Sequence, residues 1–150
     1  MNFEELKLAP ELMRALAECG YTEPTPIQAQ TIPPLLDGRD VIGSAQTGTG
    51  KTAAFVLPAL QRLAAMAPGI PPPHRATGRP RVLVLAPTRE LAQQVATQAV
   101  QYGRHLHLKT VCIYGGAPYP VQNRELARGV DILVATPGRL IDHLERGRVD

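Results

Sequence analysis

The sequence of 150 residues contains no tryptophan, and aromatic residues make up only 4% of it. A platform of aromatic rings, on which the bases of single-stranded nucleic acid stack, is therefore not evident. The two cysteines, Cys19 and Cys112, are too few and too far apart for a disulfide framework or a zinc site. We therefore expect reduced thiols and a cytoplasmic protein.

We also expect neither a secretory signal nor a membrane segment. Glu4 and Glu5 stand where a signal peptide carries positive charge, and no apolar run reaches the roughly 18 residues that a membrane helix needs. The net charge of +3 favours anionic partners without requiring them. The length suits one domain with one sizeable core.

Short apolar runs alternate with helical patterns along the chain. The runs that suit buried parallel strands are 40–44, 81–86, 109–114 and 131–135. Apolar spacing near 3.6 predicts helices at about 10–18, 26–36, 51–66, 89–102, 119–128 and 138–146. The proline-rich stretch 68–80 is predicted to be an exposed loop. This alternation predicts an α/β fold with helices on both faces of a parallel sheet, and ligands at the carboxyl ends of its strands.

The stretch 45–52, AQTGTGKT, follows a predicted strand and opens a predicted helix, which is the context of a phosphate-binding P-loop. Gly48 and Gly50 allow a tight turn that exposes backbone N–H groups beside the positive end of the helix. Lys51 would reach the β- and γ-phosphates, and the hydroxyl of Thr52 would help to hold Mg²⁺. Ala45 stands where the strict pattern has glycine, but a small residue fits there. An ordinary strand-to-helix turn is the alternative.

A second nucleotide signal lies upstream, in GYTEPTPIQ at 20–28. Thr25, Pro26 and Gln28 form the pattern of a helix start: a cap residue, proline at the first helical position, and Gln three residues after the cap. The amide of Gln28 could also pair with N6 and N7 of adenine. Phe3, in a polar stretch, could stack on the base.

The segments that follow the later strands have the chemistry of phosphate-binding corners. Thr88 and Thr136 each follow a predicted strand, and each can cap a helix close to an arginine. Because the carboxyl ends of parallel strands share one edge, a nucleic-acid backbone could run past Arg89, Gly115, Gly116, Thr136 and Arg139. Ordinary turn chemistry is the alternative, and the residues themselves do not distinguish RNA from DNA.

The histidines and one acidic residue have less prominent roles. His105 and His107 alternate, but no third ligand is spaced to complete a metal site, so we expect structural or surface roles. His143 has Asp142 nearby and is expected on a solvated helix face. Asp131 precedes a strand and is not expected to be a Walker B acid.

Phe3, GYTEPTPIQ, AQTGTGKT, APTREL (86–91), Gly115-Gly116 and ATPGR (135–139) occur in the order and spacing of one known domain. The chain resembles the first RecA-like domain of DEAD-box RNA helicases over nearly its whole length. The resemblance implies a RecA-like P-loop fold, ATP with Mg²⁺ as cofactors, and RNA as a partner bound largely through its backbone. It divides the chain into a Q motif (1–28), a P-loop (45–52) and RNA-binding motifs (86–139).

The resemblance also implies a role for each matching residue. The ATP-binding residues would be Phe3, Gln28, Thr47, Gly48, Thr49, Gly50, Lys51 and Thr52, with Lys51 and Thr52 also catalytic. The RNA-binding residues would be Pro87, Thr88, Arg89, Gly115, Gly116, Thr136, Pro137, Gly138 and Arg139.

Several parts of the family's machinery have no counterpart in this sequence. In the family, the D-E-A-D motif, the Ser-Ala-Thr motif and a second RecA-like domain with its arginine finger follow ATPGR. We therefore expect an N-terminal part of the enzyme, inactive by itself, with unpaired inner strands and an incompletely covered core. The alternatives are a non-hydrolysing ATP- and RNA-binding module, or a P-loop ATPase that acts on DNA or protein. No protein partner is indicated.

Overall fold

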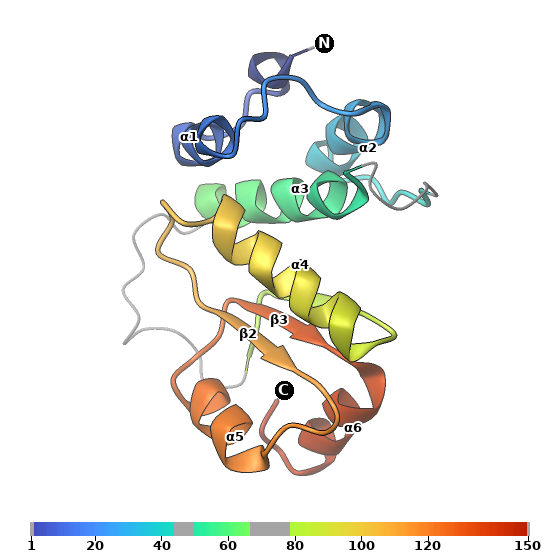
Figure 1. Cartoon of the computed structure of the whole chain (residues 1–150), viewed down its shortest axis with the longest axis vertical. Helices are drawn as coiled ribbons and strands as arrows, with labels where there is room; N and C mark the ends of the chain where they lie inside the picture. Colours follow the sequence, from blue (N-terminus) through green and yellow to red (C-terminus); the bar gives the residue numbers. More distant parts are fainter. Residues whose placement is uncertain (1, 44–49, 67–78, 150) are drawn as a thin grey trace. The chain divides into compact units, whose positions relative to one another are not determined.

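A computed structural model describes residues 2–43, 50–66 and 79–149 of the chain (Figure 1). The chain divides into two compact units. The first comprises Met1–Pro68 with Gln101–Leu106, and the second comprises Gly69–Val100 with His107–Asp150. The described part of the first unit is helical, and the second contains a parallel sheet.

The first unit is built from a short 3-10 helix, η1 (Phe3–Leu6), and from α1 (Pro10–Glu18), α2 (Pro26–Leu36) and α3 (Lys51–Met66). Helix α3 packs against α2 and α1. Leu12, Leu16, Ile32, Leu57 and Leu60 are fully buried and supply the apolar contacts that hold these helices together. The bounds predicted for these three α-helices are confirmed. Proline at N1 marks the start of α1 and of α2. Helix η1 was not predicted.

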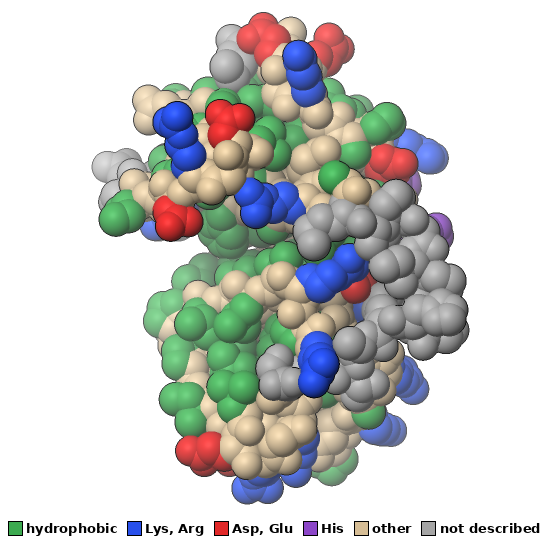
Figure 2. Space-filling model, turned by 180° about the vertical axis from the view of Figure 1, so that it is seen from behind, with side chains coloured by type: hydrophobic (Ala, Val, Ile, Leu, Met, Phe, Trp, Pro, Cys, Tyr) green, Lys and Arg blue, Asp and Glu red, His purple; other side chains and the backbone are tan. Residues whose placement is uncertain are grey.

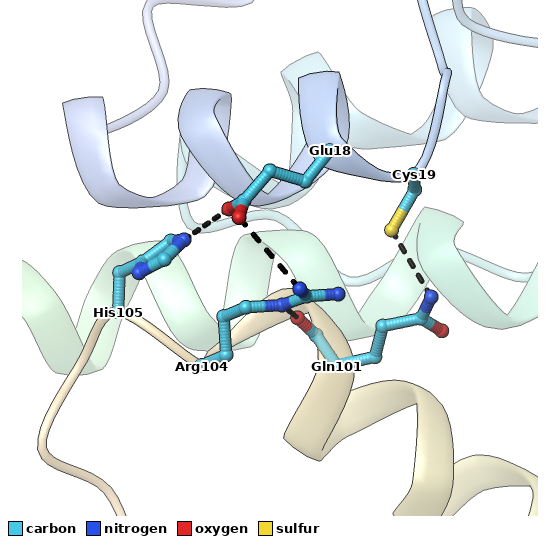
Figure 3. Close-up of polar contacts among 5 residues, drawn as sticks. All are labelled: Glu18, Cys19, Gln101, Arg104 and His105. Carbon is cyan, nitrogen blue, oxygen red and sulfur yellow. Dashed lines mark hydrogen bonds and ion pairs between the residues drawn. The ribbon is translucent and has the colours of Figure 1, made fainter.

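The end of α1 is tied to the last residues of α4 (Arg89–Tyr102) and the turn after it (Figure 3). Glu18 pairs with the His105 ring, and the Arg104 guanidinium lies 3.7 Å from the same carboxylate. Gln101 donates to the sulfur of Cys19 over 3.1 Å. The hydrogen bond from His105 holds the pKa of Glu18 below its ordinary value. His105 thus has the structural role expected from the sequence.

The sheet of the second unit contains β1 (Val82–Leu85), β2 (Thr110–Ile113) and β3 (Ile132–Ala135). The strands are parallel in the order β1-β3-β2, so β3 lies in the middle and is buried along its whole length. Leu85, Ala135 and Ile113 stand side by side at the carboxyl ends. Three of the predicted strands are therefore confirmed, each slightly shorter than expected.

Helices α4, α5 (Tyr119–Ala127) and α6 (Pro137–Glu145) follow the three strands in turn. The path from β1 through α4 crosses over β3 to reach β2, and the path through α5 returns to β3. Right-handed crossovers in opposite directions place their helices on opposite faces, and α4 lies on the other side of the strands from α5 and α6 (Figure 1). The core beneath α5 and α6 is formed by Val111, Ile113, Leu126, Val130, Leu133, Ala135, Leu140 and Val149.

Asp131 closes the starting edge of this sheet. Its side chain is 2% exposed, and one carboxylate oxygen accepts from Arg81 over 2.8 Å. The other oxygen accepts from the backbone N–H of Lys109, also over 2.8 Å. Asp131 therefore joins the segments that lead into all three strands. It lies at the opposite end of the strands from the motif residues, in keeping with the expectation that it is not a Walker B acid.

The prediction of a strand at 40–44 is wrong for the described residues, 40–43, which form neither strand nor helix. Ile42 is fully exposed there. A strand is held by hydrogen bonds to a neighbouring strand, and within the described residues none pairs with this segment. The apolar composition of the run therefore indicated neither a strand nor burial correctly: Val41 is half-buried, and Asp40, Ile42 and Gly43 are exposed.

The outer strand β1 is only partly covered. Leu83 and Leu85 are 50% and 56% exposed, whereas the alternate positions are half-buried. Figure 2 shows apolar side chains over a large part of the visible surface of the second unit. This exposure fits the expectation of an incompletely covered core. Among the described residues, no helix is both long enough and apolar enough to span a bilayer.

Candidate functional site

Gln28 connects the start of α2 with the start of α3. Its Oε1 accepts from the backbone N–H of Thr25 over 3.0 Å, as expected for a Gln three residues after a helix cap. Its Nε2 donates to the carbonyl of Gly50 over 3.1 Å, and the side chain is 6% exposed. The predicted helix start is confirmed, and the same amide also fixes the residue that precedes Lys51.

Gly50 has a backbone conformation that other residues rarely adopt, in a place with little room for a side chain. Its φ is +83°, and a Cβ there would stand 2.4 Å from Nε2 of Gln28 and 3.0 Å from Oγ1 of Thr25. That Thr25 hydroxyl is buried and has no hydrogen-bond partner within the described residues. The backbone at Gly50 is thus pressed closely against the Q motif, and an unused hydroxyl lies beside it.

Helix α3 begins directly after this contact, at Lys51. Lys51 is exposed and Thr52 is half-buried. The unpaired N–H groups of a first helical turn and the helix dipole favour an anion there. The glycine at positive φ and the exposed lysine at the start of a helix are features that suit a phosphate group, and phosphate binding here stays a prediction. Thr47, Gly48 and Thr49, which the sequence also assigns to this site, lie outside the described residues.

Phe3 lies in η1, and only 3% of it is exposed. In this structure, the ring is therefore covered by protein rather than presented to a ligand. Its stacking on adenine stays a prediction.

The predicted RNA-binding residues gather at the carboxyl edge of the sheet. Thr88 follows β1, Gly115 follows β2 and Thr136 follows β3, so the strand order places Thr136 between the other two. The exposed members of the set are Pro87, Thr88, Arg89, Gly115, Gly116, Pro137 and Gly138. The expected gathering along one edge is confirmed, while contact with RNA stays a prediction.

The two threonines at this edge use their side chains differently. The hydroxyl of Thr88 accepts from the N–H of Leu91 over 3.2 Å and so caps α4. Thr136 occupies the N-cap position of α6, but its side chain makes no capping hydrogen bond. The hydroxyl of Thr136 thus remains free of a capping role at the start of this helix.

The arginines connect neighbouring turns of the same edge. The Arg89 guanidinium lies 4.8 Å from the ring centroid of Tyr114, and a Cβ on Gly116 would stand 3.8 Å from its Nη1. Arg139 donates from Nη1 to the carbonyl of Ala117 over 2.9 Å. Each arginine thus reaches from its own motif to the turn that follows β2.

A cluster of positive charge surrounds Tyr119. The guanidinium carbons of Arg139, Arg146 and Arg148 lie 4.0, 5.2 and 5.6 Å from its ring centroid. The Tyr119 hydroxyl donates to Asp142, and this hydrogen bond is the main cause of the lowered pKa of Asp142. The cluster was not predicted, because its members are spread over two helices and the chain after them.

The expectation that His143 lies on a solvated helix face is wrong. The residue is fully buried, and its Nε2 lies 3.0 Å from Oε1 of Gln122. Burial, reinforced by the nearby Arg148 and Arg139, lowers the pKa of His143. His143 stands three residues after the buried Leu140, so both belong to the inward stripe of α6. That spacing was the available signal.

No group of three or more His, Cys, Asp and Glu side chains suited to a metal occurs in the part of the chain that the structure describes. Cys19 and Cys112 are both free thiols. Burial raises the pKa of Cys112.

Comparison with known proteins gives a consistent result. Residues 25–150 match the family model described as DEAD/DEAH box helicase. The chain is 52% identical to the ATP-dependent RNA helicase DeaD of Klebsiella pneumoniae and 48% identical to SrmB of Escherichia coli. Each comparison covers 99% of this chain, but only 22% and 32% of those relatives.

Solved structures agree. A hypothetical ATP-dependent RNA helicase from Sulfolobus tokodaii is similar with a TM-score of 0.81 and 38% identity, over 95% of this chain and 38% of that one. The yeast DEAD-box splicing factor Prp28 is similar with a TM-score of 0.83 and 40% identity, over 90% of this chain and 31% of that one. The fold is accordingly the RecA-like α/β domain of these helicases, and the chain belongs to the DEAD/DEAH box helicase family.

Proposed function

We propose that this chain supplies ATP-binding and RNA-binding motifs to an ATP-dependent RNA helicase of the DEAD-box type, which remodels or locally unwinds RNA. The observation that carries the proposal is the hydrogen bond between Gln28 and the Gly50 carbonyl. It joins the residue proposed to read adenine to the turn proposed to hold phosphates. Family membership and the names of the similar proteins support the same activity.

In this proposal, Phe3 and Gln28 hold adenine, and residues 47–52 hold the phosphates. Lys51 would neutralise charge on the β- and γ-phosphates, and the Thr52 hydroxyl would help to hold Mg²⁺. Bound Mg²⁺ would supply positive charge that stabilises the transferring phosphoryl group. The close packing of Gly50 against Thr25 and Gln28 supports this assignment, since it places the residue that precedes the N-terminus of α3 beside the residue proposed to bind adenine.

RNA would run along the carboxyl edge of the sheet, past the turns after β1, β3 and β2. Contacts to phosphates and 2′-hydroxyls from backbone N–H groups and side chains would give little sequence specificity. Affinity for RNA would fall as salt rises, because bound cations are released when phosphates are neutralised. The exposed turns on neighbouring strands support this path.

The complete enzyme would need a second RecA-like domain, which closes on this one when ATP and RNA are bound together. We place it in the cytoplasm, where free thiols such as Cys19 and Cys112 stay reduced.

The test is the variant Lys51→Ala in the full-length protein. RNA-stimulated ATP hydrolysis should fall by about 100-fold or more, since one group that stabilises the transition-state charge is removed. Lys109→Ala is the matched control, because it removes a lysine that pairs with Glu125 on the second unit. Normal RNA-stimulated hydrolysis by Lys51→Ala would refute the proposal. Hydrolysis by the unaltered enzyme without any response to RNA would instead favour a P-loop ATPase with another substrate.

A further inference from the structure

The buried polar side chain of Gln122 lies between the turn after β2 and helix α6, although no sequence motif includes it. It belongs to α5, and only 4% of it is exposed. Its Nε2 donates to the carbonyl of Tyr114 over 3.0 Å. Its Oε1 accepts from Arg139 Nη1 over 3.2 Å and lies 3.0 Å from Nε2 of His143. Both ends of the amide are therefore engaged.

These partners define the hydrogen-bonding state of the network. Because Nε2 of Gln122 donates to a carbonyl, its Oε1 must be the acceptor for both neighbours. The proton of neutral His143 then resides on Nε2, which donates to Oε1. Nδ1 of His143 is buried without a hydrogen-bond partner in the described structure. Gln122 is thus the one hydrogen-bond partner of the His143 ring within the described residues.

Each partner of Gln122 leads to a different RNA-binding motif. The Tyr114 carbonyl is directly followed by Gly115 and Gly116. Arg139 lies in the first turn of α6, directly after Thr136, Pro137 and Gly138. The same Nη1 of Arg139 also reaches the Ala117 carbonyl, on the far side of the glycine pair. The turn after β2 is consequently held at both its beginning and its end by groups that meet at or near one amide.

Packing does not explain an amide at this position. Burying an amide costs free energy unless its donor and acceptor are hydrogen-bonded, whereas burying an apolar side chain carries no such cost. The amide instead donates to the Tyr114 carbonyl at the end of β2, and it accepts from Arg139 and His143 on α6, the helix that follows β3. Only a side chain with both a donor and an acceptor can do this.

We propose that Gln122 is a positioning residue that sets the Gly115–Gly116 turn and the start of α6 in the spacing that an RNA backbone requires. This inference rests on the proposed RNA-binding function of these motifs. Gln122 itself touches no RNA and acts through Tyr114, Arg139 and His143. Removing its amide should weaken RNA binding without changing the nucleotide site, whose described residues belong to the first unit.

The experiment compares full-length proteins carrying Gln122→Leu, Gln122→Glu and the control Glu125→Gln. Affinity for a short single-stranded RNA is measured by fluorescence anisotropy, with a non-hydrolysable ATP analogue, over a series of salt concentrations. Gln122→Leu should weaken RNA binding about tenfold, which corresponds to about 1.4 kcal/mol of binding free energy. Its salt dependence should become shallower, by about 0.7 in the slope of log K against log salt for each phosphate that the protein no longer neutralises.

The other variants separate positioning from general stability. Gln122→Glu keeps the acceptor for Arg139 and His143 but places an oxygen against the Tyr114 carbonyl. Its RNA affinity should therefore lie between that of Gln122→Leu and that of the unaltered protein. Glu125→Gln, on the same helix as Gln122, removes only the half-exposed ion pair with Lys109, so RNA binding should not change. Affinity for the ATP analogue in the absence of RNA should be equal in all of them.

Three outcomes would overturn the inference: a folded Gln122→Leu protein with unaltered RNA affinity and slope, an equal loss of RNA and nucleotide affinity, or a weaker affinity with an unchanged slope. If Gln122→Leu does not fold, Gln122→Glu decides alone, and unaltered RNA binding by it would reject the inference. Absence of RNA binding by the unaltered protein would instead reject the proposed function, and so is distinguished from these results.

Discussion

The two units of this chain hold their motif residues by different means. In the second unit, paired parallel strands place three turns in a row, and the spacing of the strands sets the spacing of the turns. In the first unit, the described residues before the P-loop, 40–43, are not in a strand, and Gly50 at the end of the loop is held from the side by Gln28 and Thr25. A strand ladder thus positions one set of residues, and close helix packing positions the other.

The comparison teaches that a short motif depends on the structure that supports it. Thr88, Thr136 and Gly115 need their strands to be paired before they share an edge. Gly50 lies against side chains at the start of α2 and directly precedes α3, and these two helices pack on one another within the first unit. Substitutions should therefore affect the two sets through different supports, the helix packing in one unit and the strand ladder in the other.

The largest effect should come from Gly50→Ala, which acts on the helix-supported set. The new Cβ would stand 2.4 Å from Gln28 Nε2, so either the amide or the start of α3 must move. Affinity of the full-length protein for an ATP analogue should fall by at least about tenfold, measured by calorimetry. Gly20→Ala is the control, because Gly20 has a similar φ of +81° but open space around it. Equal affinities for the two variants would contradict the prediction.

The next largest effect should come from Asp131→Ala, which acts on the strand-supported set. The change leaves the Lys109 N–H and the Arg81 guanidinium without this acceptor at the start of the sheet. The free energy of unfolding should fall by about 2–3 kcal/mol, measured by urea denaturation. Glu125→Gln, which removes the half-exposed ion pair with the Lys109 ammonium, should cost about 0.5 kcal/mol or less. A similar decrease in both variants would show that the buried hydrogen bonds of Asp131 stabilise the protein no more than the half-exposed ion pair does.

The smallest effect should be a dependence of stability on pH that arises in the second unit. A histidine in an unfolded chain takes up a proton near pH 6.5, whereas burial keeps His143 neutral in the folded protein to lower pH. The unfolded chain therefore binds more protons below that value. The contribution of His143 to stability should be complete above pH 6.5 and decrease as the pH falls below it.

Urea unfolding at about pH 7.5 and about pH 5.5 measures this dependence. The variant His143→Gln should lose less stability between the two conditions than the unaltered protein. The carboxylates of Glu18, Glu125 and Asp142 also have lowered pKa values, but their contributions are lost at more acidic pH, through the range below 4.5. An identical pH dependence in both proteins would show that His143 can be protonated within the folded structure.

The sequence predicted the helices well because their signals are local. Proline at N1 and apolar spacing mark α1 and α2 to within a residue, and α6 begins at Pro137 rather than 138. The gathering of Thr88, Gly115 and Thr136 was also predictable, because parallel strands impose a common edge. RNA and ATP binding by these residues remain predictions.

The failures have two origins: some features depend on partners distant in the sequence, and in one case a local helical spacing was overlooked. The run at 40–44 has the composition of a strand but, within the described residues, no neighbour to pair with. His143 looked solvated because of its sequence neighbours, although its position after Leu140 turns it inward. Gln122 carried no signal, since its partners lie 8, 17 and 21 residues away.

The polarity of the β-strands in the second unit has a practical consequence for engineering. The segments that lead into the strands are joined by Asp131, and the last residues of the strands lead into the exposed turns. Random mutagenesis should accordingly yield poorly expressed clones from changes at the beginning of a strand, and well-expressed but inactive clones from changes just beyond its end. A library restricted to the second class of positions would therefore separate changes in function from losses of folding.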